Sequence, residues 1–446
     1  MTFPVDLFLN AFQKRDEGMD MDMDMSMPDN SNNSTSNSDS STKTHDIVLN
    51  FHFFLVLHLV TFFVAFGLVY PYAFACKQAK RTKRHILFVT LGLALTVVGF
   101  ISGHLTGIDH YNSWFSDIGA IFCWAITAGS YFLLVYVDNP FLSHLRRGLN
   151  VLHTSLSTIQ PLVCWVTTGL SIISLMRFCG SEGDHTGQCL AHGIMGTAFV
   201  TYGVILFAMM YFGEQFLVRH NRSQEYLDSW VITIWGIVNT FTEHRWGKPW
   251  NHKDVQHTSM GIIWWALGMF GIYTTWDRVN NKPKRSHVPA LIILATGYSM
   301  LSHSQSIKVS SKVHFMFGVV LMLTALVRII EISFVLNDEP ADNSNIRVWQ
   351  FLTPLLLVEC GMLFMSATEQ SMEFLTRHGI MAAPYILIIS SVASFVALAV
   401  LIPIQSYVRM RNENKVQLAY KEGTDDIEMP FLAEPTEDTD SFNVDE

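Results

Sequence analysis

About eleven apolar runs, most of them long enough to cross a bilayer as helices, fill the sequence between Ile47 and Ser406. An α-helix rises about 1.5 Å per residue, so about 20 residues cross the roughly 30 Å hydrocarbon core. Backbone polar groups have no water partner in lipid, and the runs lack the alternation of barrel strands, so we expect helices. The predicted fold is therefore an all-α, polytopic transmembrane helix bundle with spans at residues 47–76, 86–107, 114–137, 151–177, 190–212, 226–242, 258–275, 288–303, 313–336, 348–367 and 382–406.

Lys and Arg residues gather in alternate loops, and this pattern predicts the orientation of the chain. The loops after odd-numbered spans carry dense basic clusters, such as Lys77 to Arg84 and Arg278 to Arg285. Cytosolic loops carry an excess of Lys and Arg. The N-terminal tail is therefore predicted outside or in a lumen, and the C-terminal tail in the cytosol.

Two further features agree with this orientation. Asn32 and Asn33 each begin an Asn-x-Ser/Thr triplet, which is a glycosylation signal on the lumenal side, and Cys179 and Cys189 flank the polar fourth loop. A disulfide between these cysteines would need that oxidising side. Both features favour the secretory route, so we expect an endomembrane, vacuolar or plasma membrane. A mitochondrial membrane is less favoured, because the Arg-rich amphipathic start of an import signal is absent.

Composition excludes several classes of protein. Half of the 446 residues are hydrophobic and only 15% are charged, whereas soluble chains carry about 25%. The net charge of −9 reflects ten acidic residues between Glu422 and Glu446, and no folded segment offers the basic face that nucleic acid requires. Walker, dinucleotide-binding and Gly-x-Ser-x-Gly motifs are absent, which disfavours a self-contained ATPase, reductase or hydrolase. The lipid bilayer is the partner that the sequence predicts, and it does not fix an oligomeric state.

The N-terminal tail alternates Met with Asp, and this repeat is one candidate metal site. The thioethers belong to Met19, Met21, Met23, Met25 and Met27. Soft thioether sulfur suits Cu⁺, and the carboxylates between add attraction for any cation. The competing interpretation is low-complexity drift in a solvated, disordered tail.

Histidines inside or at the ends of the predicted spans form a second set of candidates. A b-type haem takes two axial imidazoles from facing helices. His85 and His153 fall at the cytosolic ends of their spans, whereas His104 and His192 fall at the outer ends, with His58 part of the way down the first span. Intramembrane ionisable residues are functional candidates by default, and helix packing with a bond to a backbone carbonyl is the alternative for each.

The segment from Thr242 to Trp265 is a third candidate. It places Glu243, His244, His252 and His257 around helix-breaking Gly and Pro residues. These residue types can ligate a metal, but their spacing matches no standard zinc pattern. A structured aromatic loop at the membrane interface is the alternative.

Arg328, Glu331 and Glu359 are further candidates within predicted spans. Arg328 and Glu331, three residues apart, are predicted to form an ion pair on one helix face. Glu359 is predicted either to contribute to a proton or cation path or to bond a neighbouring helix.

The block FTEHRWGKPWNHKDVQHTSMGIIWW and the spans around it resemble the C-terminal half of the fungal Ytp family of transmembrane proteins, described as similar to mitochondrial electron transporters. The sequences HLVTFFVAFGLVYPYA, HILFVTLGLALTVVGF and HTSLSTIQPLVCW resemble helices of the ascorbate-dependent transmembrane b-type cytochrome core. That second resemblance implies a haem between His85 and His153. Tyr111 to Ile118 replace the start of the expected third helix and carry no ligand histidine for an outer haem.

Composition, the candidate sites and these resemblances together predict four regions and leave three functions open. The regions are a disordered lumenal tail, a b-type-cytochrome-like helical domain, a Ytp-like helical domain and an acidic disordered cytosolic tail, at 1–46, 47–215, 216–410 and 411–446. A haem-binding transmembrane electron carrier with an electron donor as partner is the first function. A membrane transporter or copper-handling protein is the second, and a haemless membrane scaffold is the third.

Overall fold

The computed structural model describes the helical part of the chain and one short hairpin. Described residues are 53–106, 129, 146–176, 186–242, 244, 247, 249–301, 305–336 and 346–422. Residues 1–49 lie outside this set, and everything below concerns the unit Asn50–Glu446.

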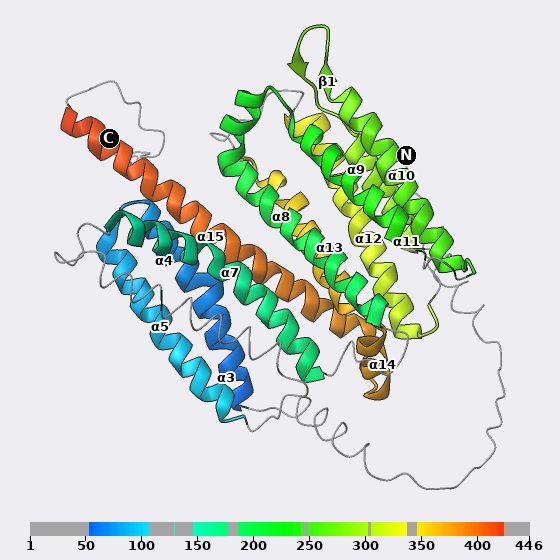
Figure 1. Cartoon of the computed structure of the whole chain (residues 1–446), viewed down its shortest axis with the longest axis horizontal. Helices are drawn as coiled ribbons and strands as arrows, with labels where there is room; N and C mark the ends of the chain where they lie inside the picture. Colours follow the sequence, from blue (N-terminus) through cyan, green and yellow to red (C-terminus); the bar gives the residue numbers. More distant parts are fainter. Residues whose placement is uncertain are drawn as a thin grey trace, which may run out of the picture. The chain divides into compact units, whose positions relative to one another are not determined.

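The described elements follow one another as helices in nearly the order of the predicted spans (Figure 1). They are α3 (Phe53–Phe62), the π-helical η1 (Phe63–Val69), α4 (Tyr70–Gln78), α5 (Thr82–His104), α7 (Arg146–Met176), α8 (Thr186–His220), α9 (Gln224–Thr242), α10 (His252–Thr274), β1 (Trp276–Asp277), β2 (Lys282–Pro283), α11 (Val288–Leu301), α12 (Lys308–Ile330), the π-helical η3 (Glu331–Leu336), the 3₁₀-helical η4 (Val348–Phe351), α13 (Leu352–Ser366), α14 (Glu369–Arg377) and α15 (Ala382–Glu422).

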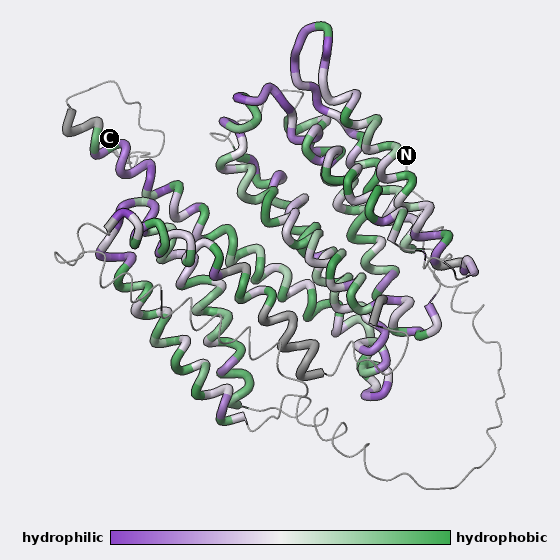
Figure 2. The backbone as a smooth tube through the Cα atoms, viewed as in Figure 1, coloured by the Kyte–Doolittle hydropathy of each residue, from purple (hydrophilic) through white to green (hydrophobic). Residues whose placement is uncertain are grey.

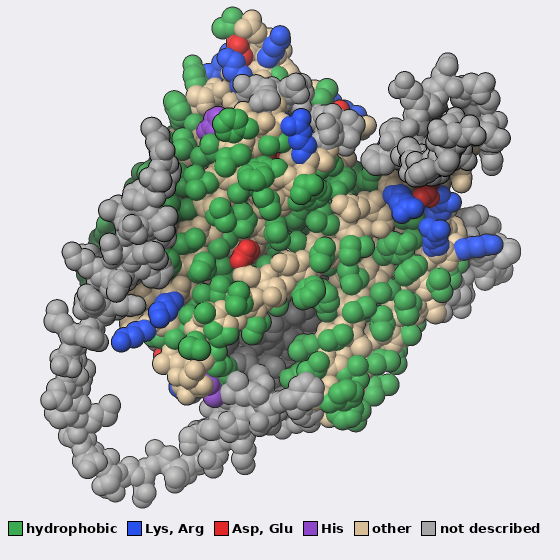
Figure 3. All heavy atoms as spheres, turned by 180° about the vertical axis from the view of Figure 1, so that it is seen from behind, with side chains coloured by type: hydrophobic (Ala, Val, Ile, Leu, Met, Phe, Trp, Pro, Cys, Tyr) green, Lys and Arg blue, Asp and Glu red, His purple; other side chains and the backbone are tan. Residues whose placement is uncertain are grey.

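These helices confirm the predicted all-α membrane bundle. They coincide with ten of the eleven predicted spans, and the third, 114–137, lies outside the described residues except for position 129. Within the described ranges, six helices are long and apolar enough to cross a membrane, and α11 is a shorter apolar helix. Figure 2 shows green, hydrophobic stretches along the helices and purple, hydrophilic residues at their ends. In Figure 3 most of one face is covered by hydrophobic side chains, with Lys and Arg near its margins.

Helices α8 to α13 pack in close pairs whose crossings depend on glycine. In the α8–α13 crossing, a Cβ added to Gly361 would lie 2.5 Å from the carbonyl oxygen of Gly196. In the α11–α12 crossing, a Cβ on Gly318 would lie 2.7 Å from the carbonyl oxygen of Gly297. Small residues let helix backbones approach closely in membranes, where packing contributes much of the association energy.

Helix α15 packs against both the N-terminal helices and the helices from α8 onward. Phe395 lies edge-on to Phe63 of η1, and Gln405 donates a hydrogen bond to the Tyr211 hydroxyl of α8. Near its end, Glu413 forms an ion pair with Arg81 at 3.1 Å. The helix runs to Glu422, so the prediction of a disordered tail beginning at residue 411 is wrong for residues 411–422. Contacts with the α4–α5 turn hold this segment as a helix.

The basic loops and the β1–β2 hairpin lie at one end of the helices, and α14 lies at the other (Figure 1). Asn221, in the α8–α9 turn, donates a hydrogen bond to the carbonyl oxygen of Asn281 in the hairpin. We call this the hairpin end. It is the end that the distribution of Lys and Arg predicts to be cytosolic.

Candidate functional site

A network of buried charges near the hairpin end joins α9, the loop before α11, α12 and η3. The buried ion-pair network consists of the carboxyl groups of Glu225, Asp228 and Glu331 and the guanidinium groups of Arg285 and Arg328. Glu225, near the start of α9, accepts hydrogen bonds from Arg328 at 2.7 Å and from Arg285 at 3.0 Å. Arg328 also contacts Glu331 at 2.7 Å, which confirms the predicted ion pair on α12. A single arginine thus joins two carboxylates from different helices.

Two hydroxyl groups extend the network to further helices. Thr353 of α13 donates a hydrogen bond to Glu331 at 3.0 Å, and Tyr202 of α8 donates one to Asp228. Asp228 also lies close enough to Arg328 to interact with its charge. The network therefore joins α8, α9, α12 and α13 through polar side chains.

Every charged member of the network is nearly removed from solvent. The side chains of Glu225, Arg285 and Glu331 are 1%, 7% and 4% exposed. Removing one partner from such a pair costs about 3–5 kcal/mol, while replacing a whole pair by apolar residues is often neutral or stabilising. Burial of this kind is therefore weak evidence of a purely structural role. In a membrane, ionisable residues of this kind mark substrate, ion or proton pathways.

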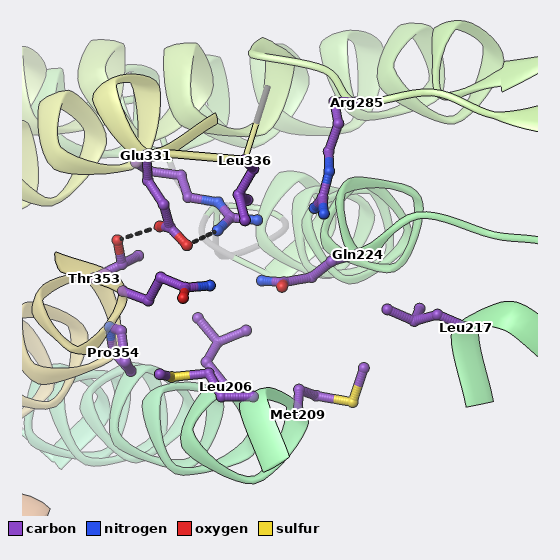
Figure 4. Close-up of a pocket in the computed structure, with 12 residues that line it drawn as sticks. Leu206, Met209, Leu217, Gln224, Arg285, Glu331, Leu336, Thr353 and Pro354 are labelled. Carbon is purple, nitrogen blue, oxygen red and sulfur yellow. Dashed lines mark hydrogen bonds and ion pairs between the residues drawn. The ribbon is translucent and has the colours of Figure 1, made fainter. Parts of the chain in front are cut away.

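A small cavity adjoins the network. Its volume for water-sized spheres is about 50 Å³, and its lining includes Gln224, Arg285, Arg328, Glu331 and Thr353. One water needs at least about 10–15 Å³ on this measure, so the cavity is large enough for a few waters. Figure 4 shows the polar ends of Gln224 and Arg285 directed into the same space as Glu331.

Sequence reasoning missed most of this network. Asp228 lies inside a predicted span, and Glu225 lies one residue before it. Their spacing of three residues on one helix face was the available signal. Arg285 was counted among the basic residues of a cytosolic loop, whereas its side chain is buried against Glu225.

His85 and His153 form an inner histidine pair near the hairpin end. Their Nε2 atoms lie 3.2 Å apart, and both residues are buried. The Nδ1 of His85 donates a hydrogen bond to the carbonyl oxygen of Ala73 at 2.8 Å. Because a carbonyl only accepts, His85 presents a lone pair at Nε2, and the Nε2 of His153 donates to it. The two imidazoles of α5 and α7 therefore face one another.

The geometry of this pair is that of a hydrogen bond. Two trans axial imidazoles on one iron would hold their nitrogens about 4 Å apart, twice a metal–nitrogen bond of about 2.0 Å. The observed 3.2 Å is shorter, and the proton on the Nε2 of His153 occupies the position of a metal. Haem between these helices would require the helices to move apart and His153 to change tautomer.

His58 and His104 each bond a backbone carbonyl oxygen of α5. The Nδ1 of His58 donates to the carbonyl oxygen of Gly99 on α5 at 2.8 Å. His104 is exposed and bonds the carbonyl oxygen of Phe100 within its own helix. These are the backbone contacts that a helix-packing or interfacial histidine makes.

His192 lies in a group that the sequence did not pair. Its ring is 5.9 Å from the ring of His314 on α12 and stacks at 4.7 Å on Phe364 of α13. His257 of α10 is close enough to act on it electrostatically. We call His192, His257 and His314 the outer histidine cluster. Two members, His192 and His257, came from separate predictions, one for haem and one for metal.

The loop before α10 has the structure of a helix cap. His244 stacks on Trp250 at 3.9 Å and contacts Asp254 at 3.1 Å, while Asn251 caps the helix through the backbone N–H of Asp254. Burial raises the pKa of Asp254, but hydrogen bonds from His244 and Asn251 outweigh it and hold the pKa below its usual value. Thus His244 and His257 belong to different contacts, and the side chains of Glu243 and His252 lie outside the described residues.

The other predicted site residues are only partly covered. Cys189 is disulfide-bonded, and its pairing with Cys179 stays a prediction because position 179 lies outside the described set. The five tail methionines and the sequons at Asn32 and Asn33 also lie outside it. Glu359 accepts a hydrogen bond from Ser390 of α15 at 2.5 Å, which is the neighbouring-helix alternative. In the described ranges, no three His, Cys, Asp or Glu side chains are placed to hold a metal.

These features together define a polytopic α-helical membrane protein with ionisable groups buried among its helices. A model of the family "Protein YTP1-like, C-terminal" matches residues 163–407. The chain belongs to this family, which confirms the resemblance of its C-terminal half. No solved structure matches the chain.

Three named relatives match parts of the chain. Protein YTP1 of Saccharomyces cerevisiae is 40% identical over 309 residues, covering 67% of this chain and 66% of that protein. Uncharacterized membrane protein C3B8.06 of Schizosaccharomyces pombe is 26% identical over 42% of this chain, and uncharacterized membrane protein YCR061W of S. cerevisiae is 25% identical over 56% of it. The matches span just under two thirds of the first relative and less than half of the other two.

Proposed function

We propose that this protein is a membrane transporter in which helices α8 to α13 move a cation in exchange for protons or together with them. One observation carries the proposal: a buried network of ionisable groups adjoins a cavity large enough for water. A structural ion pair needs neither the water nor the charge imbalance described next.

The network contains more acid than base. Three carboxyl groups face two guanidinium groups, so full ionisation would leave one negative charge in excess. Glu225 and Glu331 each contact Arg328 at 2.7 Å, whereas Asp228 accepts from the neutral hydroxyl of Tyr202. Asp228 is therefore the carboxyl whose charge is least compensated, and such a group gains a proton most readily. It supplies the exchangeable proton of the proposed cycle.

The path from this network toward the α14 end begins with an apolar barrier. Phe317 of α12 is 2% exposed and packs against Phe199 of α8 and Phe364 of α13 at ring distances of 6.2 and 4.9 Å. The outer histidine cluster adjoins Phe364 beyond it. Two polar regions separated by a packed apolar layer are what a transporter needs to avoid a continuous leak.

The test measures proton flux into vesicles that contain the purified protein and a pH-sensitive dye, driven by a Zn²⁺ gradient, with the membrane potential clamped by potassium and valinomycin. Asp228→Asn keeps the shape and the hydrogen bond to Tyr202 but cannot carry a proton. We expect at least a tenfold loss of protein-dependent flux in this variant. Glu413→Gln, which removes one exposed carboxylate near the hairpin end, is the matched control and keeps the flux. Flux equal to that of empty vesicles, or unchanged in Asp228→Asn, contradicts the proposal.

A second candidate is an electron carrier with one b-type haem, favoured because His85 and His153 face one another. Haem would require the helices to open by about 0.8 Å between these nitrogens, from 3.2 to about 4 Å. A reduced-minus-oxidised absorbance spectrum of the purified protein decides this candidate. A Soret and α-band change that His85→Gln abolishes would support it, and a featureless spectrum would remove it.

A further inference from the structure

His192 and His314 both bond the backbone of their own helices through Nδ1. The Nδ1 of His192 lies 2.8 Å from the carbonyl oxygen of Gln188, and the Nδ1 of His314 lies 2.9 Å from that of Ser310. Each carbonyl accepts, so each Nδ1 carries the proton and each neutral ring directs a lone pair from Nε2. Histidines that ligate metals are oriented in this way, with the second nitrogen bonded to a backbone carbonyl or a carboxylate.

The Nε2 atom of His192 is buried, and no hydrogen bond within the described part of the chain replaces the contact with water that it has lost. His192 is 7% exposed, and this nitrogen has no hydrogen-bond partner among the described residues. An unsatisfied buried acceptor is unfavourable, because it has given up its hydrogen bonds to water. The stack on Phe364 fixes the ring plane, so the nitrogen cannot readily turn toward another donor. The arrangement is stabilised once a donor or a cation binds at that nitrogen.

The two rings are close enough to share one ion. A metal bound at about 2.0–2.1 Å from Nε2 lies roughly 3.2 Å from the ring centroid, so two rings on one metal have centroids at most about 6.4 Å apart. The observed separation is 5.9 Å, with the ring planes at 83°. This distance corresponds to an angle at the metal between the tetrahedral and the linear value.

We propose that His192 and His314 bind a late first-row transition-metal cation, Zn²⁺ or Cu⁺, between α8 and α12. Imidazole nitrogen suits these ions. With two protein ligands instead of four, the remaining positions stay open to water, which fits an ion that must be released and not a structural metal. The transport role of this ion rests on the function proposed above, whereas its binding does not. Helices α8 and α12 also carry Tyr202 and Arg328, so both sites are on the same two helices.

The test is equilibrium dialysis of the full-length protein in detergent against Zn²⁺, and against Cu⁺ under reductant, with the bound metal measured by mass spectrometry. We expect His192→Gln and His314→Gln each to weaken one site by at least about tenfold, since even the loss of a group behind a ligand costs 10–100-fold. His104→Gln is the matched control, because His104 has the same bond from Nδ1 to its own helix but is exposed. Metal bound by the methionine tail is common to all variants and cancels.

Two results overturn the metal site. One is equal binding by the wild type and both histidine variants, and the other is an equal loss in His104→Gln. If both variants fail to fold, Co²⁺ added to the wild type decides, because absorption bands of nitrogen-ligated Co²⁺ that Zn²⁺ displaces support the site and their absence refutes it. The two measurements separate the two proposals. Metal binding without proton flux in the wild type refutes only transport, and proton flux without histidine-dependent metal binding refutes only the metal site.

Discussion

Substitution of Glu225 by Gln separates the contribution of burial from that of contact number in the ion-pair network. Glu225 accepts from two arginines, Arg285 and Arg328, with its side chain 1% exposed. Glu413 also contacts two arginines, Arg81 at 3.1 Å and Arg409 at 3.2 Å, but its side chain is 42% exposed. Gln in either position keeps the size of the side chain and removes one negative charge. The two variants thus differ mainly in burial.

The expected magnitudes are far apart. Removing one partner of a buried pair leaves the other charge in a medium that solvates it poorly, at a cost of about 3–5 kcal/mol. Removing one partner of an exposed pair costs about 0–1 kcal/mol, because water and salt already screen the charge. At roughly 2–4 °C per kcal/mol for domains of 150–250 residues, Glu225→Gln lowers the melting temperature by roughly 6–20 °C, and Glu413→Gln by at most about 4 °C.

Both variants are measured by heating in detergent, followed by size-exclusion chromatography with tryptophan fluorescence. The double variant Glu225→Gln with Arg285→Met is expected to recover part of the loss, since it removes a buried cation with its partner. Equal shifts for the two single variants would refute the argument that burial determines the strength of this network. A neutral Glu225→Gln would show that Asp228 and Glu331 compensate both arginines.

Three further changes test other parts of the fold. Gly361→Ala places a Cβ 2.5 Å from a backbone oxygen of α8 and is expected to destabilise by about 1–3 kcal/mol in the same heating assay, whereas Gly193→Ala, with nothing within 4 Å, is neutral or slightly stabilising. Hydrogen bonds from Asn280 and Val279 and the nearby Lys284 ammonium hold the pKa of Asp277 well below its usual value, so this carboxylate stabilises the hairpin above about pH 4 and less as pH falls below it. The protection of residues 276–284 against hydrogen exchange, corrected for the intrinsic effect of pH, should fall below about pH 4, and Asp277→Asn should remove that dependence. His85→Gln loses the bonds to Ala73 and His153 and is expected to lower stability by about 1–3 kcal/mol, seen as a lower melting temperature.

The membrane bundle could be predicted because lipid imposes a simple rule on sequence. A helix must satisfy its own backbone and stay apolar for about 20 residues, and this is visible without knowledge of neighbouring helices. Helix ends were harder to place. Residues 411–422 read as a polar tail, yet Glu413 bonds Arg81 and Asn414 donates to the carbonyl oxygen of Ala79. Those contacts come from a segment more than 300 residues away in the chain.

The ion-pair network shows why buried charge is difficult to find from sequence. Loop arginines are interpreted as orientation signals, and Arg285 contributes to that signal while its side chain is buried. Only the local pair of Arg328 and Glu331 could be predicted, because a spacing of three residues places both on one helix face. The bonds from Glu225 depend on how α9 packs against α12, which a single sequence does not specify.

For the histidines, the depth of each ring in the bilayer and the identity of its neighbouring histidine are two separate questions. The difference bears directly on function. Sequence position predicts the depth of each imidazole, because position along a helix corresponds to depth in the bilayer. Pairing depends on which helix faces lie together: His192 was placed at the outer end of its span, as His104 was, and lies beside His314, 122 residues further along the chain. His85 and His153 were expected to pair and do so, at a distance set by their own hydrogen bond. The pair predicted to bind a cofactor thus has its facing nitrogens satisfied by one another, whereas the buried Nε2 without a partner belongs to His192. A buried nitrogen of that kind is the stronger indication of a ligand, because its free energy improves only when something binds.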